Sequence, residues 1–424
     1  MVEGTHRTTQ RGADLPAVTT GKDRVAFVDI GRAIAALLVV YTHIPGRNPA
    51  ETGPGEHTAY LAVIEAFTSE PLHMLKQGIG QVAVPFLFLV SGFVVTPSAI
   101  KQGQARFAIN RLLRIYAPMI FVVTVTALAL IANLHPPSTG QAQDLSPLTI
   151  LTNITTANYL IYPQVVLVPV AWTMIIEVLF YLMLLALVPL LRRSVWLTIA
   201  VELTFVFVVL MSRSELNESY SLFAANVSFL PILIIGQIIW ATTTRRIPLW
   251  AGGIFGATAW SLYVLAGIVG IHRIDNSYNL AVAIAVLCFL VGLFAEERLK
   301  QRRFWVALSE RTYSIYLLHG LCLYVVLHAL SDVPFTIGLI AALAATALLV
   351  EISYRLVEAP SHKLARHLSR RRRRPRAQPV QAETRHREPS ETATPTQTSA
   401  NEVTQELEAI GHSGRGPHRE LHDG

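Results

Sequence analysis

The apolar residues of this chain fall into blocks of about 20, the length that a helix needs to cross a bilayer. Ten such blocks are predicted as membrane spans, at residues 25–45, 80–98, 115–134, 165–190, 195–211, 224–242, 248–270, 278–295, 313–331 and 335–357. Of the 424 residues, 52% are hydrophobic and only 15% are charged, whereas a soluble protein carries about a quarter charged residues. We therefore expect an all-α fold, a polytopic bundle of about ten transmembrane helices in the cell membrane, which is the inner membrane if the cell is bacterial.

Lys and Arg are unevenly shared between the loops that would join these spans. One alternate set of internal loops holds four of them, Arg47, Lys76, Arg213 and Arg273. The other set holds thirteen: Lys101, Arg106, Arg111, Arg114, Arg192, Arg193, Arg245, Arg246, Arg298, Lys300, Arg302, Arg303 and Arg311. Since cytoplasmic loops carry the excess of Lys and Arg, both termini are predicted to face the cytoplasm. The net charge of +7 is explained by the same pattern, so no nucleic-acid partner is expected.

Composition divides the chain into three predicted parts. Residues 1–24 form a disordered cytoplasmic N-terminus, without the apolar core of a signal peptide. Residues 25–360 form the transmembrane domain. Residues 361–424 form a cytoplasmic tail, in which the basic run Arg370–Arg374 is expected to contact anionic membrane lipids. The rest of the tail is rich in Thr, Glu, Gln, Pro and Arg and is expected to be disordered.

Arg32 and His43 stand eleven residues apart in the first span. Eleven helical steps bring two side chains back to within about 20° of each other, roughly 16 Å apart along the axis. Such polar groups in a membrane helix usually face a protein interior or a wet cavity. Histidine suits a general base and arginine a phosphate partner, while a snorkelling arginine with an interfacial histidine is the structural alternative. Asp29, one turn before Arg32, is a candidate partner for it.

The second span and the loop after it contain two further motifs. Gly92, beside Ser91, allows the close approach of another helix or of an extended ligand, and helix packing is the favoured role. Arg111 and Arg114 are three residues apart and therefore neighbours on a helix face. They are either anchors that follow the positive-inside pattern or a clamp for phosphates that arrive from the cytoplasm.

Two later spans also contain ionisable residues. Glu177 lies in the middle of the fourth span, with Tyr181 one turn further on and able to form a hydrogen bond with it. A glutamate at this depth stays protonated or finds a partner, for which Arg32 and His43 are candidates; both a structural and a catalytic role remain open. His319 lies in the ninth span, where a structural role is favoured. No Cys/His or HExxH spacing occurs, so no metal site is expected.

In this order the motifs resemble the acyltransferase-3 family of integral-membrane O-acyltransferases. The resemblance runs from about residue 24 to residue 365. It rests on Arg32 with His43, Ser91 to Phe93, Arg111 with Arg114, Trp172 with Glu177, Phe180 and Tyr181, the segment with Tyr313, Ser314, Tyr316 and His319, and Glu358 with Pro360. Two positions depart from the pattern: Ile176 stands where the family usually has a second acidic residue, and Leu318 stands where an aromatic residue usually precedes the histidine.

The resemblance implies transfer of an acetyl or short acyl group from cytoplasmic acyl-CoA to a hydroxyl of a carbohydrate or glycolipid. Acyl-CoA is then a co-substrate, and no bound cofactor is expected. His43 is the predicted catalytic base, and Glu177 orients it or pairs with its charge. The predicted substrate-binding residues are Arg32, Ser91, Arg111, Arg114, Tyr181 and His319. The competing class is a non-enzymatic permease or flippase for a lipid-linked or anionic small molecule, which also needs buried Arg, Glu and His.

Overall fold

The computed structural model describes residues 25–45, 59–74, 77–137, 143–271 and 277–371, and the predicted all-α class is confirmed within these ranges. The α-helices are α1 (Ala26–Thr42), α2 (Ala59–Thr68), α3 (Ala83–Gln102), α4 (Gln104–Ile131), α5 (Pro147–Thr155), α6 (Trp172–Arg193), α7 (Val195–Met211), α8 (Glu218–Val227), α9 (Leu230–Thr243), α10 (Leu249–Ile268), α11 (Tyr278–Ala295), α12 (Arg303–Ala329), α13 (Phe335–Ser353) and α14 (Ala359–Arg371). The predictions for residues 1–24 and for the disordered tail lie outside the described residues.

Eight helical segments of the described chain are long and apolar enough to cross a membrane. This makes the protein a multi-pass membrane protein. The first and fifth predicted blocks are also helical, as α1 and α7, but each of these helices has only 17 residues. The count of ten spans and the cytoplasmic position of the termini therefore stay predictions.

The helices extend beyond the apolar blocks into their charged flanks. α4 begins at Gln104, so Arg111 and Arg114 lie on its early turns rather than in a loop. Gly103 alone separates α3 from α4, with φ at +74°, a conformation that glycine adopts without a steric penalty. The same extension occurs at α12, which begins at Arg303. Both helices begin earlier than the apolar pattern predicts, because the charged residues that flank a span are still good helix formers.

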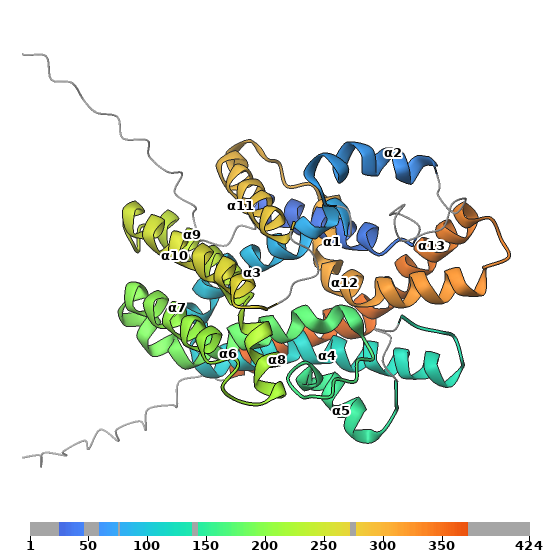
Figure 1. Cartoon of the computed structure of the whole chain (residues 1–424), viewed down its shortest axis with the longest axis horizontal. Helices are drawn as coiled ribbons and strands as arrows, with labels where there is room; N and C mark the ends of the chain where they lie inside the picture. The colour runs from blue at the N-terminus through green and yellow to red at the C-terminus, as the bar shows by residue number, and fades with distance from the viewer. Residues whose placement is uncertain (1–24, 46–58, 75–76, 138–142, 272–276, 372–424) are drawn as a thin grey trace, which may run out of the picture. The chain divides into compact units, whose positions relative to one another are not determined.

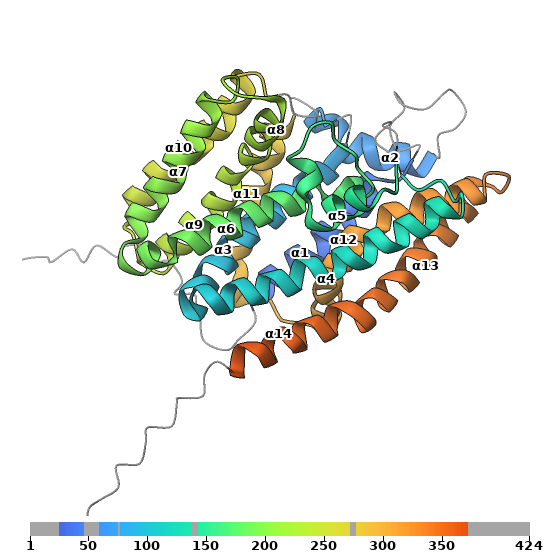
Figure 2. The ribbon, with the colours of Figure 1, turned by 90° about the horizontal axis from the view of Figure 1, so that it is seen from below.

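Five helices, α1, α3, α4, α6 and α12, enclose the polar interior of the described chain. α7, α9 and α10 pack together as a separate group, and α9 joins this group to α3 (Figures 1 and 2). α13 packs against α12 and continues through a π-helix, Tyr354–Glu358, into α14. α14 in turn packs against α4 (Figure 2).

Glycines bring α3 and α9 into backbone contact. A Cβ atom on Gly92 would lie 1.8 Å from the carbonyl oxygen of Leu233, and one on Gly236 would lie 2.1 Å from that of Leu89. Neither position has room for any side chain, so the two helices pack at the distance that only small residues allow. The helix-packing role predicted for Gly92 is confirmed.

The N-terminus of α1 is held by side chains from much later in the chain. The backbone N–H groups of Ala26 and Phe27 each donate to the carboxylate of Glu296, at 2.8 Å. This satisfies two donors that a helix start leaves open and places a negative charge at the positive end of the helix dipole. The Asp29 carboxylate accepts hydrogen bonds from Ser309 at 2.7 Å and from Gln301 at 2.6 Å.

The candidate pairing of Asp29 with Arg32 is therefore corrected. Arg32 forms no salt bridge with Asp29, because the Asp29 carboxylate is turned toward donors on and just before α12. The two charges still act on each other electrostatically. Asp29 thus ties α1 to α12 and so sets the position of the α1 side chains relative to those of α12.

Candidate active site

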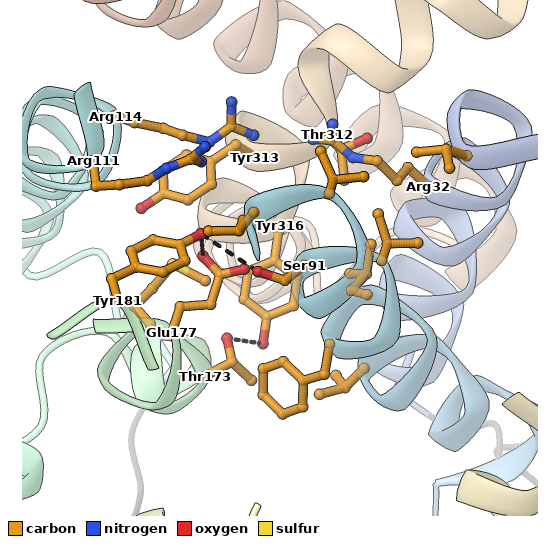
Figure 3. Close-up of a pocket in the computed structure, with 18 residues that line it drawn as sticks. Arg32, Ser91, Arg111, Arg114, Thr173, Glu177, Tyr181, Thr312, Tyr313 and Tyr316 are labelled. Atoms are coloured by element: carbon orange, nitrogen blue, oxygen red, sulfur yellow. Dashed lines mark hydrogen bonds between the residues drawn. The ribbon is translucent and has the colours of Figure 1, made fainter. Parts of the chain in front are cut away.

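Three arginines meet at one cavity of about 180 Å³, which we call the arginine cavity. Arg32 reaches it from α1, and Arg111 and Arg114 reach it from α4 (Figure 3). Among the described residues, the side chains of Arg32 and Arg114 form no hydrogen bond or salt bridge. The three arginines outnumber the one carboxylate that lines this cavity, that of Glu177, so the cavity is suited to an anionic ligand.

Arg111 is held in place by aromatic rings. Its guanidinium lies 5.2 Å from the centre of the Tyr181 ring and 5.5 Å from that of Phe107. Its Nη2 donates to Ser98 Oγ at 3.3 Å, while its buried Nε has no hydrogen-bond partner in the described part of the chain. Cation–π contacts and one hydrogen bond therefore orient this arginine and leave donor capacity for a ligand.

Glu177 brings a carboxylate into the same cavity. The Tyr181 hydroxyl donates to Glu177 Oε2 at 3.0 Å and lies 3.5 Å from Ser91 Oγ (Figure 3). The Glu177 charge acts electrostatically on Arg32 and Arg111. Of the two partners suggested by the sequence, Arg32 shares a cavity with Glu177, whereas His43 lines a different one.

A pair of histidines lies at the far end of α1. His43 follows the last residue of that helix, and the fully buried His319 faces it from α12. Nδ1 of His43 lies 3.2 Å from Nε2 of His319, and the ring centres are 4.8 Å apart. The structure therefore brings together two residues that the sequence separates by 276 positions.

The hydrogen bonds around these rings assign their tautomers. Nδ1 of His319 lies 3.0 Å from the Ile315 carbonyl oxygen, and Nδ1 of His43 lies 2.9 Å from the Val39 carbonyl oxygen. A carbonyl accepts only, so each Nδ1 carries the proton and Nε2 of neutral His319 keeps its lone pair. Nδ1–H of His43 then has two acceptors, the Val39 oxygen and that lone pair. The basic nitrogen of His43 is consequently Nε2.

His43 also lines a cavity of about 430 Å³, which we call the histidine cavity. Its other aromatic lining residues are His135, Trp172, Tyr324 and His328, and the rings of His135 and His328 lie 4.4 Å apart. His135 follows the end of α4 and His328 lies in the last turn of α12, so this cavity lies at the opposite helix ends from Arg111. The sequence patterns did not single out His135 or His328 as site residues. Their positions at the outer ends of two spans are the signal that could have identified them.

One wall of the histidine cavity is a non-helical segment held by two buried side chains. The Asn153 amide donates to the Val165 carbonyl and accepts from the Leu167 N–H, each at 2.9 Å. The Tyr159 hydroxyl donates to the Val168 carbonyl at 2.8 Å. Burial raises the pKa of Tyr159, so its hydroxyl stays protonated and keeps donating. The wall is thus pre-formed without a ligand.

Tyr316 stands between the arginine cavity and the histidine cavity. It lines the first, and its hydroxyl donates at 3.0 Å to the carbonyl of Val170, which lines the second. Thr173 donates to the same hydroxyl at 2.9 Å (Figure 3). The Tyr316 ring lies 6.2 Å from that of His319. These contacts form a partition, held by two hydrogen bonds, across the path between Arg32 and His43.

A third cavity of about 490 Å³, the entrance cavity, shares Arg32, Arg111 and Arg114 with the arginine cavity. It lies at the helix ends that the charge pattern assigns to the cytoplasm. Within the described ranges, no three His, Cys, Asp or Glu side chains are grouped so that they could hold a metal ion. The three cavities therefore offer cations, three carboxylates (Glu177, Glu310 and Glu358), hydroxyls and imidazoles as their chemical groups.

The fold and the site define a class of protein: an integral-membrane protein formed by a multi-pass helical bundle with polar cavities in its interior. A family profile described as an acyltransferase domain matches residues 25–354, so the chain belongs to the acyltransferase-3 family. It is an acyltransferase, and a membrane O-acyltransferase in the broad sense. The chain has no match among the curated proteins and none among the solved structures.

Proposed function

We propose that this acyltransferase moves an acetyl or short acyl group from cytoplasmic acyl-CoA to a hydroxyl of a carbohydrate or glycolipid acceptor. The observation that carries the proposal is the arrangement along α1: Arg32 lines both the arginine cavity and the entrance cavity, and His43 lines the separate histidine cavity. The same arrangement suggests that the donor enters from the arginine side and the acceptor from the histidine side. Acyl-CoA acts as a co-substrate, and no resident cofactor is required.

The donor would lie along α1. Its phosphates would bind Arg111 and Arg114, whose planar guanidinium groups match phosphate oxygens. Eleven residues of helix separate Arg32 from His43, which corresponds to roughly 16 Å at the rise of an α-helix. An extended pantetheine arm is of this order, so phosphates held at one end of α1 leave the thioester near His43 at the other.

The chemistry would be a direct acyl transfer. Nε2 of His43 takes the proton of the acceptor hydroxyl as the hydroxyl oxygen attacks the thioester carbonyl carbon. The bond from this carbon to sulfur then breaks, and the sulfur leaves as the thiol of CoA with the proton that His43 returns. A base of this kind typically contributes ~10²–10⁴ to the rate. His319 positions His43 through the Nδ1 hydrogen bond, and Glu177 balances the charge of the arginines.

Transfer also needs the partition at Tyr316 to open. Two hydrogen bonds hold this side chain, to Val170 and from Thr173, and their loss frees the ring to turn. Arrival of the thioester arm would be the trigger, since its amide groups can replace both hydrogen bonds. In the closed form the partition would keep water of the histidine cavity away from the thioester.

The test uses the purified full chain with acetyl-CoA labelled in the acetyl group and cell-envelope glycan fractions as acceptors. Wild-type protein is expected to transfer label to glycan. His43→Ala is expected to abolish transfer while the variant still inserts and purifies normally. If His43→Ala still catalyses transfer, His43 is not the catalytic base.

The competing function is a permease or flippase, which is favoured by the same buried charges and by cavities at both helix ends. Movement of a labelled lipid-linked or anionic compound across proteoliposomes, without transfer of the acetyl label, would establish the carrier and refute the enzyme mechanism proposed above. If acetyl transfer is observed instead, mass spectrometry of envelope glycans from a strain that lacks this chain would name the acceptor through the loss of one acyl mass.

A further inference from the structure

One side of the entrance cavity is formed by α14, a helix that the proposed donor site does not use. Lys363 and Arg366 both line this cavity, together with Arg111 and Arg114 of α4. They are three residues apart on α14 and so share one face of that helix. α14 packs against α4 (Figure 2), which places the two basic pairs on different helices around one space.

The π-helix before α14 determines which face of α14 meets the cavity. A π turn holds more residues than an α turn, so it rotates the helix that follows relative to the one before, and such turns are frequent at functional sites. Glu358, the last residue of the π-helix, is only 2% exposed and accepts a hydrogen bond from Ser314 of α12 at 2.8 Å. The start of α14 is thereby attached to the bundle, and the face with Lys363 and Arg366 is held toward the cavity.

The entrance cavity has an excess of positive charge. Its Lys and Arg residues are Arg32, Arg111, Arg114, Lys363 and Arg366, and its carboxylates are Glu310 and Glu358. Lys363, like Arg32 and Arg114, forms no hydrogen bond or salt bridge with any described residue. Within the described ranges, Arg366 donates to the backbone carbonyl of His362 alone, at 3.3 Å.

These basic groups form two clusters, because one pair stands on α4 and the other on α14. A ligand that satisfies both needs two separate anionic groups. Coenzyme A has this form, since its ribose carries a diphosphate on one side and a 3′-phosphate on the other. An adenylate without the 3′-phosphate would leave the α14 pair without a partner.

We propose that Lys363 and Arg366 bind the 3′-phosphate of acyl-CoA while Arg111 and Arg114 bind its diphosphate, an inference that rests on the proposed function. α14 then acts as the part of the donor site that distinguishes CoA from other adenine nucleotides. The two side chains are exposed at the mouth of the cavity, so their pairing with phosphate is partly screened by solvent.

The test compares coenzyme A with 3′-dephospho-coenzyme A as ligands of the full chain in phosphatidylcholine nanodiscs, which contain no anionic lipid. Wild-type protein is expected to bind CoA about tenfold more tightly, the factor that two partly screened charge pairs supply. The double variant Lys363→Ala, Arg366→Ala is expected to bind CoA only as tightly as dephospho-CoA. Its affinity for dephospho-CoA should equal that of the wild-type protein. Lys363→Arg should keep the preference.

Arg355→Ala is the matched control, since Arg355 pairs with Glu351 on the preceding turns and does not line the cavity. It should leave both affinities unchanged. The inference is overturned if wild-type protein binds the two ligands equally. It is also overturned if the double variant lowers the affinities for CoA and dephospho-CoA by the same factor, or changes neither affinity. Absence of CoA binding by wild-type protein would overturn the proposed function and this inference with it, whereas equal binding with intact transfer overturns the inference alone.

Discussion

His319 is predicted to act by positioning His43 and not by carrying the proton itself. His43 Nδ1–H has two acceptors, the Val39 oxygen at 2.9 Å and His319 Nε2 at 3.2 Å. His319→Phe keeps a ring of similar size in this fully buried site but removes the second acceptor. The Val39 carbonyl remains, so the tautomer of His43 is kept and only its orientation is loosened.

The expected cost is that of one neutral hydrogen bond, about 0.5–1.5 kcal/mol. If this is lost from the transition state, kcat falls about 2- to 13-fold. This is far less than the ~10²–10⁴ expected for loss of the base itself in His43→Ala. His319→Gln, whose amide oxygen can accept from His43 Nδ1–H, should recover part of the loss.

The assay is single-turnover transfer of labelled acetyl from acetyl-CoA to glycan, with a thermal melt of each variant in detergent as the control for folding. If His319→Phe lowers the transfer rate as much as His43→Ala does, His319 takes part in proton transfer. An unchanged rate in a properly folded His319→Phe would show that His319 does not orient the base. Either result refutes the assignment of His319 as a positioning residue.

Three further predictions concern stability and donor binding. Gly92→Ala should lower stability by about 1–3 kcal/mol or prevent folding, because its Cβ would meet the Leu233 backbone, while Gly253→Ala, with nothing within 4 Å, should not change the melting temperature in detergent. Glu296→Ala should lower the melting temperature by removing the cap of α1, a loss of about 1–2 kcal/mol, and an unchanged melt would contradict that role. Arg114→Ala should raise the Kd for acyl-CoA about 10- to 100-fold, as expected for one charge-assisted hydrogen bond, and an unchanged Kd from titration would remove the clamp.

The fold class was predictable because the membrane requires long apolar helices, and these leave a direct pattern in the sequence. The same reasoning identified Gly92, whose lack of a side chain is needed where α3 meets α9. The proximity of Arg111 to Arg114 was also predictable, because residues three apart on a helix share one face of it.

What the sequence did not reveal depends on packing between distant helices. The groups that donate hydrogen bonds to the Asp29 carboxylate lie 272 and 280 residues further along the chain, so the pairing with Arg32 that local spacing predicted was wrong. His328 and Lys363 line cavities only because α12 and α14 pack against other helices. The spacing of nearby residues does not predict this packing. Lys363 fell within the predicted cytoplasmic tail, where only the later basic run Arg370–Arg374 was given a role, contact with anionic lipids.

The central claim, that donor and acceptor reach His43 from opposite helix ends, is tested most directly by a sided transfer assay. Full-length protein of known orientation is placed in sealed proteoliposomes, with labelled acetyl-CoA on the Arg114 side and glycan acceptor on the His43 side only. Labelled glycan should form with wild-type protein and not with His43→Ala. Transfer only when acetyl-CoA and glycan are supplied on the same side would contradict a passage through the bundle.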